Sequence, residues 1–340
     1  MAQPLASNKR IAVGASCLAR LPKADLHVHL EGAMRPETLA DLAGIHGKPT
    51  PQVGGYRSFD QFQHGYRAIV KLIRTRDDLC RLVREVVEDA AASGAVWIEP
   101  HFNPTTYSPA LGSAEDVLDL VLETGLAAGR PLHVGFGIIL GASRNREPRQ
   151  ATDLARLAAA YAGRGVVAFG LTGDETVGSA EEFKDACSIA RSAGLILAPH
   201  AGELSGSLSL RSTLDVLSPD RIAHGIRAVE DSMLLDRLTD EGITLDVCLT
   251  SNLALGVVHR IKEHPLPRIL EAGVCCSLGS DDPLLLRTSL LAEFQVARSE
   301  LMLTDSQLAA LARTSIQSSG APDNVRAYAL PGIDAWLGRR

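Results

Sequence analysis

Residues of the types that bind metal ions stand at the ends of several short apolar segments in this chain. The first segment ends in the HVH motif at residues 27–29, where alternation along a strand would place both imidazoles on one face. Two histidines at this spacing are weak support by themselves, since such pairs are commonly structural. Three further apolar segments end in HAGE at 200–203, HG at 224–225 and DD at 281–282. Imidazole combined with carboxylate favours zinc, and iron or manganese less specifically.

Apolar, β-branched segments alternate with longer amphipathic ones, which is typical of parallel strands joined by helices. We expect eight strands, near residues 24–29, 95–100, 132–138, 166–171, 195–200, 220–224, 243–248 and 274–280. This pattern predicts an α/β protein, a (β/α)8 barrel of the TIM type. Active sites of such barrels lie at the carboxyl ends of the strands, which is where the four polar motifs stand. The motifs are therefore expected to share one site.

The stretch between the first two predicted strands, about 65 residues, is too long for a single crossover. We expect it to form extra helices over the barrel mouth, including one within residues 59–73. The C-terminal part should form closing helices, one of which begins after an N-cap at Thr304. We interpret residues 1–20 as an N-terminal extension and residues 21–340 as a single metal-dependent hydrolase domain.

Composition argues against several other classes of protein. The chain has 340 residues, a net charge of −6 and no basic stripe, so nucleic acid is not an expected partner. No apolar run approaches the ~18–20 residues of a membrane span. The six cysteines have no regular spacing, which favours reduced thiols in a cytoplasmic protein. A glycine-rich phosphate loop, a G-x-S-x-G nucleophile motif and the P-C-x-x-C motif of the nucleobase deaminases are absent from the sequence.

Six sequence blocks carry a resemblance to a known family. The blocks are LPKADLHVHLEGAMRPETL, GLTGDE, HAGE, RIAHGIRAVED, CLTSN and SLGSDDP. With these blocks the chain resembles the adenosine and adenine deaminases of the amidohydrolase superfamily, from Leu21 to the end. The resemblance implies that one zinc ion per chain is held by His27, His29, His200 and Asp281. Many relatives in the superfamily bridge two metals with a modified lysine on strand four, but residues 171–174 offer none, which favours a mononuclear site.

The resemblance further implies that Glu203, His224 and Asp282 perform the chemistry and that Gly173 places a backbone N–H against a purine. Zinc would supply hydroxide at neutral pH, because it lowers the pKa of water from about 15.7 to about 7. Glu203 would protonate N1 of the ring, which requires its pKa to lie well above about 4.3. His224 would orient the hydroxide. Asp282, directed away from Asp281, would accept the water's proton or align the hydroxide.

Weaker candidates surround these residues. Phe59 and Phe62 are spaced for one helix face, and they either close over the base as substrate contacts or pack in the core. Glu99 and His101, at the end of the second predicted strand, are candidates for substrate contacts or for a supporting pair. The TSN sequence at 250–252 either supports the site or is an ordinary polar loop.

Two motifs disagree about the substrate. Adenosine-specific members of the family usually continue the first motif as HLDG, whose aspartate engages the ribose 5′-hydroxyl. This chain has HLEG with Glu31, as is common in relatives that act on free adenine or altered nucleosides. The LTGDE sequence at 171–175 instead resembles the nucleoside enzymes. We therefore expect hydrolytic deamination of a 6-aminopurine nucleoside, adenosine first, to an inosine-type product and ammonia. Adenine and a 5′-modified nucleoside such as aminodeoxyfutalosine stay open as alternatives.

Two other functions are compatible with the scaffold. One is a different amidohydrolase reaction, such as hydrolysis of a cyclic amide, because fold does not fix function. The other is a catalytically inactive relative retained for binding. That function would predict loss of a metal ligand or of Glu203, and all seven implied positions are intact. The expected partner is thus a small-molecule aminopurine.

Overall fold

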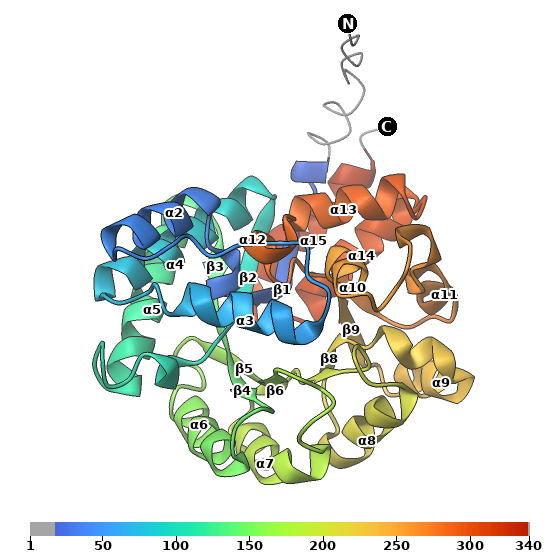
Figure 1. Cartoon of the computed structure of the whole chain (residues 1–340). Coiled ribbons are helices and arrows are strands. Elements are labelled where there is room, and N and C mark those ends of the chain that lie inside the picture. Colours follow the sequence, from blue (N-terminus) through green and yellow to red (C-terminus); the bar gives the residue numbers. More distant parts are fainter. Residues whose placement is uncertain (1–17, 339–340) are drawn as a thin grey trace, which may run out of the picture.

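In the computed structural model, which describes residues 18–338, parallel strands form two sheets (Figure 1). The first contains β1 (Lys23–His29), β2 (Ala95–Phe102), β3 (Gly135–Phe136), β4 (Ile138–Ser143), β5 (Val166–Thr172) and β6 (Ile196–Leu197). Its order is β1-β2-β4-β5-β6, with β3 also paired to β2. The second contains β7 (His200–Ala201), β8 (Arg221–His224), β9 (Thr244–Val247) and β10 (Cys276–Leu278), in the order β10-β9-β8-β7. The extension predicted at residues 1–20 lies almost wholly outside the described residues.

β6 and β7 belong to one segment that passes from the first sheet to the second. Between them, the N–H of Ala198 donates to Phe169 O of β5 at 2.9 Å, whereas Pro199 O accepts from the N–H of Ala223 on β8 at 3.0 Å. Pro199 has no N–H of its own to donate, and the ladder breaks there. The prediction of an α/β fold with parallel strands is confirmed, but within residues 18–338 the assigned strands do not close into one ring.

The outer edges of the two sheets meet near the ends of β1 and β10. Val28 and Asp281 form an isolated parallel bridge. The N–H of Asp281 donates to His27 O, and the N–H of His29 donates to Asp281 O, both at 2.7 Å. The first strand and the segment after the last strand are thus tied together at the residues that carry the implied metal site.

One predicted strand is displaced along the chain. The sequence predicts a strand at 132–138, but Arg130–Leu132 form a 3-10 turn and His133 has a left-handed backbone with a φ of 56°. Regular pairing with β5 begins only at Ile138 and continues to Ser143. Pro131 in the turn and the left-handed His133 keep the first part of the predicted range out of an extended conformation.

Helices follow the strands and surround them (Figure 1). Three lie between β1 and β2, as the sequence predicts: α2 (Pro36–Ile45), α3 (Phe59–Val70) and α4 (Arg76–Ala92). The others are α5 (Ala114–Gly129), α6 (Pro148–Ala160), α7 (Lys184–Ser192), α8 (Ser207–Leu217), α9 (Ser232–Asp240), α10 (Leu249–Ala254), α11 (Leu266–Glu271), α12 (Pro283–Leu286), α13 (Leu290–Ser299), α14 (Asp305–Gln317) and α15 (Asp323–Leu337). The predicted cap of α14 is confirmed, since Thr304 accepts a hydrogen bond from the N–H of Gln307. Among the described helices, none has the length and apolar character needed to cross a membrane.

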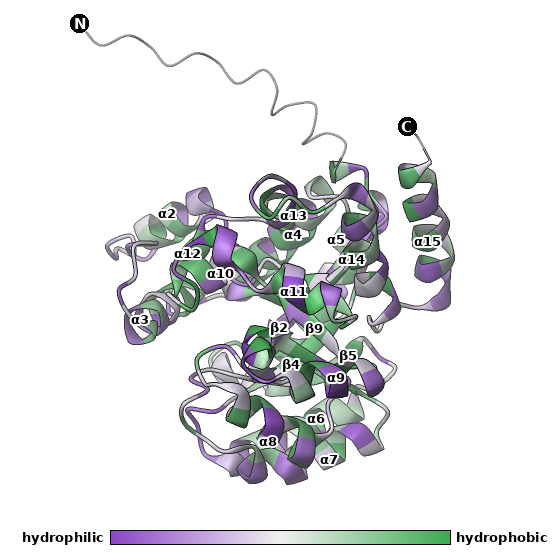
Figure 2. Cartoon of the chain, turned by 90° about the vertical axis from the view of Figure 1, so that its right-hand side faces the viewer, coloured by the Kyte–Doolittle hydropathy of each residue, from purple (hydrophilic) through white to green (hydrophobic). Residues whose placement is uncertain are grey.

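Burial of the strands explains their apolar sequences. Every residue of β8, β9 and β10 is buried, as expected for parallel strands covered by helices. The helices bury one stripe each: on α4, Leu79, Leu82, Val83 and Val86 are buried at helical spacing. Figure 2 shows both hydrophobic and hydrophilic residues on the outer helices. The polar site residues are therefore carried by strands that apolar packing holds in place.

Candidate metal centre and active site

The four implied metal ligands lie together at the carboxyl ends of β1, β7 and β10. His27 Nε2 is 3.1 Å from His200 Nε2 and 3.7 Å from Asp281 Oδ1. His29 Nε2 is 3.4 Å from the same Asp281 oxygen. Ligands bound at about 2.0–2.1 Å to a tetrahedral zinc ion are about 3.3 Å from one another. These three distances are close to that value, and the three histidines offer nitrogen atoms within 4.8 Å of one another, so the donor types and these spacings suit a zinc ion.

A second group of possible ligands overlaps the first. His27, His224, Cys248 and Asp281 also offer atoms within 4.8 Å of one another. Burial raises the pKa of the Cys248 thiol well above its ordinary value, which disfavours the thiolate that zinc binds. The set of three histidines with Asp281 is the better match, because neutral imidazole is already the form that binds a metal.

Burial disfavours the charged form of His29, His200 and His224. It lowers the pKa of His29 to about 4 and holds the pKa values of His200 and His224 well below their ordinary range. Burial by itself would raise the pKa of Asp281, but the neighbouring imidazoles, that of His27 most, lower this pKa to about 2. His29 and His200 are thus available as neutral nitrogen donors and Asp281 as an ionised carboxylate, which are the forms that bind a metal.

The ring of His27 is oriented from behind by the backbone. Its Nδ1 lies 2.9 Å from the carbonyl oxygen of Asp246 on β9. A carbonyl oxygen can only accept, so Nδ1 carries the proton and Nε2 keeps a free lone pair. Nε2 is the atom that lies near His200 and Asp281. Metal-binding histidines are commonly fixed in this way through their second nitrogen.

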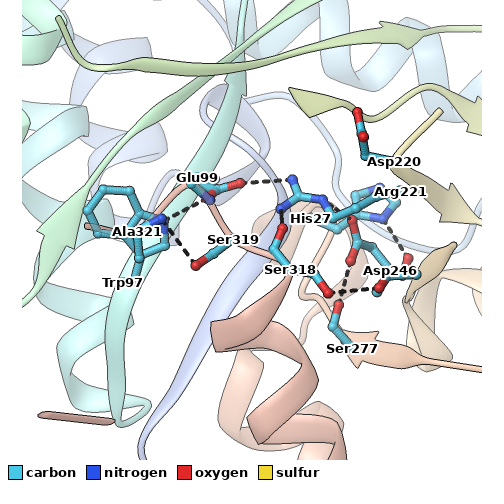
Figure 3. A network of polar contacts seen from close by, with 12 residues as sticks. His27, Trp97, Glu99, Asp220, Arg221, Asp246, Ser277, Ser318, Ser319 and Ala321 are labelled. Atoms are coloured by element: carbon cyan, nitrogen blue, oxygen red, sulfur yellow. Dashed lines mark hydrogen bonds and ion pairs between the residues drawn. The ribbon is translucent and has the colours of Figure 1, made fainter. Parts of the chain in front are cut away.

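A buried ion-pair network lies beside the metal centre (Figure 3). Arg221 Nη2 is 2.8 Å from Glu99 Oε2, and Arg221 Nε is 3.1 Å from Asp246 Oδ2. Trp97 Nε1 donates to Glu99 Oε1 at 2.7 Å, and Ser277 Oγ donates to Asp246 Oδ1 at 2.6 Å. All three charged side chains are at most 1% exposed. The carboxylates of Glu99 and Asp246 therefore share one guanidinium away from solvent. Asp246 is also the residue whose backbone carbonyl orients His27.

Glu99 and His101, the two candidates at the end of β2, have separate surroundings. Glu99 accepts hydrogen bonds from Arg221 and from the N–H of Gly320. Both ring nitrogens of His101 are without a hydrogen-bond partner within residues 18–338. The ring of His101 instead stacks on His29, with 5.0 Å between ring centroids, and lines the cavity described below.

Glu203, the implied acid, lies next to His224. Their closest atoms, Glu203 Oε2 and His224 Nε2, are 3.4 Å apart, and both side chains are buried. Burial raises the pKa of Glu203 well above its ordinary value, and Asp281 and Glu175 raise it further. A carboxyl group that keeps its proton near neutral pH can serve as a general acid.

Glu175 holds the loop that carries Glu203, a role that the sequence does not reveal. Its carboxylate accepts hydrogen bonds from the N–H of Gly202 at 2.6 Å and of Glu203 at 2.9 Å. The N–H of Ser205 and the hydroxyl of Ser209 also donate to it, at 3.0 and 2.7 Å. Each of these hydrogen bonds is charge-assisted, so together they restrain the loop strongly. The last residue of the GDE sequence therefore positions the acid.

The carboxyl group of Asp282 lies close to that of Asp281 and lines the same cavity. Ligand atoms of both carboxylates lie within 4.8 Å of each other and of His29. Asp281 has a left-handed φ of 56°, which breaks the alternation at this residue. Gly32 leaves the space that the carboxylate occupies, since a Cβ there would lie 1.7 Å from Asp282 Oδ1. Burial and the adjacent Asp281 raise the pKa of Asp282 well above its ordinary value.

The candidate substrate contacts line one cavity of about 790 Å³ together with the residues of the implied chemistry. The candidates are Glu31, Phe59, Phe62 and Gly173. Phe59 and Phe62 stack on each other, with ring centroids 5.7 Å apart. Gly173 has a φ of +93°, and a Cβ there would lie 2.4 Å from Asn145 Oδ1, so the position requires glycine.

Glu31 is held in the cavity wall by two tyrosines. The hydroxyl of Tyr66 donates to Glu31 Oε2, and the hydroxyl of Tyr107 donates to Oε1, each at 2.8 Å. Burial raises the pKa of Glu31 above its ordinary value. Because both of its oxygens already accept a hydrogen bond, Glu31 is a fixed part of the wall.

Proteins of similar sequence and structure are known. The sequence model of the adenosine deaminase family matches residues 22–336. A Streptomyces virginiae protein provisionally named adenosine/adenine deaminase is 44% identical over an alignment of 331 positions, which covers 94% of this chain and 98% of the relative. The crystal structure of an adenine deaminase from Arthrobacter aurescens matches with a TM-score of 0.86 at 28% identity, over 94% of this chain and 99% of that one. The structure of an amidohydrolase from Burkholderia ambifaria with bound zinc matches with a TM-score of 0.85 at 25% identity, over 96% of this chain and 94% of that one.

Proposed function

Because the chain belongs to the adenosine/adenine deaminase family and is an aminohydrolase of that type, we propose that it deaminates a 6-aminopurine nucleoside with one zinc ion per chain. The observation that carries this proposal is the buried Glu203, with a raised pKa, placed 3.4 Å from His224 beside the cluster of metal-binding residues. Hydrolytic deamination needs a nucleophile at C6 and a proton for the ring, and this arrangement can supply both.

His27, His29, His200 and Asp281 would hold the zinc ion, since the spacing of their donor atoms suits a tetrahedron. When bound, zinc supplies hydroxide near neutral pH by lowering the pKa of a water molecule to about 7. The related amidohydrolase with bound zinc supports this choice of metal.

The chain's own side chains would move the protons. Glu203 would donate a proton to N1 of the purine, which offsets the loss of aromaticity when the nucleophile adds to C6, and its raised pKa supports this role. His224 would orient the attacking oxygen and stabilise the charge that forms on it. Asp282 would align the nucleophile or accept its proton, and the N–H of Gly173 would contact the purine.

The size of the cavity favours a nucleoside as the substrate. Its volume is about 790 Å³, and it reaches past Glu31 and Gly173 to Gln63, Asn145 and Arg146. A base alone would leave much of this volume unfilled, whereas a ribosyl group extends toward the polar residues, and sites generally enclose most of their ligand. Adenosine is therefore the first candidate, with Phe59 and Phe62 placed to cover part of it.

Glu31 favours a second candidate, free adenine. Both of its oxygens already accept tyrosine hydroxyls, so a ribose 5′-hydroxyl would have to reach a remaining lone pair of a carboxyl group that the two tyrosines hold in place. The name of the Arthrobacter aurescens relative agrees with this candidate. A 5′-modified nucleoside such as aminodeoxyfutalosine is compatible with both observations, because it fills the cavity without a 5′-hydroxyl.

Rates of ammonia release by the zinc-loaded protein separate these substrates. We expect kcat/KM to be higher for adenosine than for adenine, and 5′-deoxyadenosine to retain most of the adenosine value because Glu31 is already engaged. A preference for adenine of more than tenfold, ~1.4 kcal/mol of transition-state binding, would contradict the nucleoside assignment. Turnover of cyclic amides without turnover of any aminopurine would contradict deamination itself.

We extend the proposal to the architecture, as one (β/α)8 barrel domain over residues 21–340. The bridge between Val28 and Asp281 supports it at one junction of the two sheets. The continuous segment that contains β6 and β7 supports it at the other.

A further inference from the structure

Two buried polar residues, Asn252 and His264, form a hydrogen-bonded group with Glu203 and His224. Asn252 belongs to α10, and its side chain has no exposed surface. His264 follows the 3-10 turn Ile261–Glu263 and is 3% exposed. The sequence indicates nothing about His264, because it belongs to none of the motifs.

The direction of the hydrogen bonds in this group follows from one backbone donor. The N–H of Leu266 lies 3.1 Å from His264 Nδ1, so Nδ1 must accept and carries no proton. The proton of the His264 ring is therefore on Nε2. His264 Nε2 lies 3.1 Å from Asn252 Oδ1 and donates to it. Burial lowers the pKa of His264 to about 4, which agrees with a neutral ring that has one proton.

The orientation of the Asn252 amide determines which atoms of His224 and Glu203 accept a hydrogen bond from it. With Oδ1 turned toward His264, the NH2 group faces His224 Nδ1 at 3.3 Å and Glu203 Oε1 at 3.4 Å. An amide NH2 can only donate, so Nδ1 of His224 accepts and carries no proton. The proton of the neutral His224 ring is then on Nε2, the atom that lies 3.4 Å from Glu203 Oε2.

We propose that His264 and Asn252 are positioning residues that hold His224 in the tautomer with its proton on Nε2. This inference rests on the proposed function, in which His224 must meet the attacking oxygen as a hydrogen-bond donor. The opposite tautomer would present a lone pair to that oxygen and would repel the charge that forms on it. The same amide also restrains the carboxyl group of Glu203, so one side chain sets the geometry of two reacting groups.

Nitrogen-15 NMR of the zinc-loaded wild-type chain, labelled at histidine, tests the tautomer directly. Protonated and unprotonated ring nitrogens have well-separated chemical shifts, and the His224 signals are assigned by their loss in His224→Gln. We expect a protonated Nε2 and an unprotonated Nδ1 on His224 without substrate. A proton found on Nδ1 of His224 in the wild type overturns the proposal, and this result needs no substitution of Asn252 or His264. If the wild type releases no ammonia from any aminopurine, the proposed function fails while this spectrum still decides the tautomer.

Asn252→Asp reverses one hydrogen bond with almost no change in shape. The new carboxylate still accepts from His264 but cannot donate to His224, so we expect the proton of His224 to move to Nδ1. A wrong histidine tautomer costs up to about 10⁴-fold in kcat in the serine protease triad, and we expect a loss of at least about 10²-fold with KM changed less than about threefold. Asn324→Asp, an exposed change of the same charge on α15, should keep kcat within about twofold. If the nitrogen-15 signals of His224 in Asn252→Asp are the same as in the wild type, Asn252 does not set the tautomer of His224.

His264 is tested by a conservative and a disruptive change. In His264→Gln, the amide can accept from the N–H of Leu266 and donate to Asn252, so the His224 spectrum and most of kcat should be kept. In His264→Leu both should change, and zinc content and circular dichroism identify a chain that has failed to fold. If folded His264→Leu keeps the wild-type spectrum and kcat, His264 is not a positioning residue.

Discussion

Replacing Arg221 by methionine removes the cation from the buried network beside the metal centre. Glu99 and Asp246, both within 3.1 Å of the guanidinium, would then be buried without an opposite charge. Breaking a buried ion pair from one side costs about 3–5 kcal/mol, because the remaining charge has lost both water and its partner. Arg221→Met should therefore destabilise the fold by an amount within this range.

Differential scanning calorimetry measures this loss. With an unfolding entropy of about 2.1 cal/mol/K per residue, a chain of this length loses about 4–7 °C of melting temperature for 3–5 kcal/mol. Arg156→Met is the matched control, since Arg156 forms an ion pair with Asp153 at 2.8 Å but is 65% exposed. Solvent screens that pair, and the control should shift the melting temperature by less than about 1 °C.

The pH dependence gives a second readout. Burial already raises the pKa of Asp246 and Arg221 lowers it, so this pKa should rise further in Arg221→Met. A folded-state pKa above the unfolded value adds stability below the unfolded pKa, and this stability is lost as pH rises through the folded pKa. The deficit of the variant should therefore be small near pH 4 and grow toward pH 7.

Two results would refute this reasoning about the network. One is a melting temperature of Arg221→Met within about 2 °C of the wild type at pH 7. The other is a deficit that does not change with pH. Because the Asp246 carbonyl orients His27, we also expect the variant to bind zinc about tenfold more weakly, the lower end of the usual effect of residues that support a ligand.

Three further predictions concern the acid, the metal and a buried lysine. Glu203→Gln should lose about 10²–10⁴-fold in kcat with its zinc retained, and a rate above about a tenth of the wild type would remove Glu203 as the proton donor. Metal analysis should find about one zinc per chain, whereas two tightly bound ions per active chain would contradict the mononuclear site. Burial lowers the pKa of Lys23 from 10.5 to about 7, so the wild type is destabilised below pH 7 and recovers as pH rises toward 10.5. Lys23→Met should thus be the more stable chain below pH 7, by roughly 5 kcal/mol at most, and urea unfolding that shows a pH-independent difference would contradict the assignment.

The candidate site was largely predictable because its residues are polar where their surroundings are apolar. His27 and His29 lie among the last three residues of β1, His200 begins the short β7, and Asp281 follows β10. The other residues of these strands are buried, and parallel strands bring their carboxyl ends to one edge. The structure brings these four residues together as expected. Such a pattern can be read from spacing alone, since it depends only on strand order and direction.

Contacts between separate loops could not be predicted in this way. Glu175 binds backbone N–H groups about 30 residues further along the chain, and those donors exist at every non-proline residue. His264 is recognisable only through its contact with Asn252. The side-chain direction of Asp282 depends on the left-handed backbone of Asp281, and aspartate allows that conformation without requiring it. In each case the contact or side-chain direction depends on the tertiary structure and not on the local sequence.

The backbone bridge between β1 and Asp281 has a consequence for the order of events during synthesis of the chain. Three of the four implied zinc ligands belong to two segments about 250 residues apart, and the bridge at Val28 joins those segments. At a synthesis rate of about 5–20 residues per second, His27 and His29 leave the ribosome tens of seconds before Asp281 exists. A truncated chain lacks the last ligand and both hydrogen bonds that align it. For the proposed zinc site we therefore expect metal loading to be a late event in biogenesis, and zinc content to distinguish complete, folded molecules from unfinished ones.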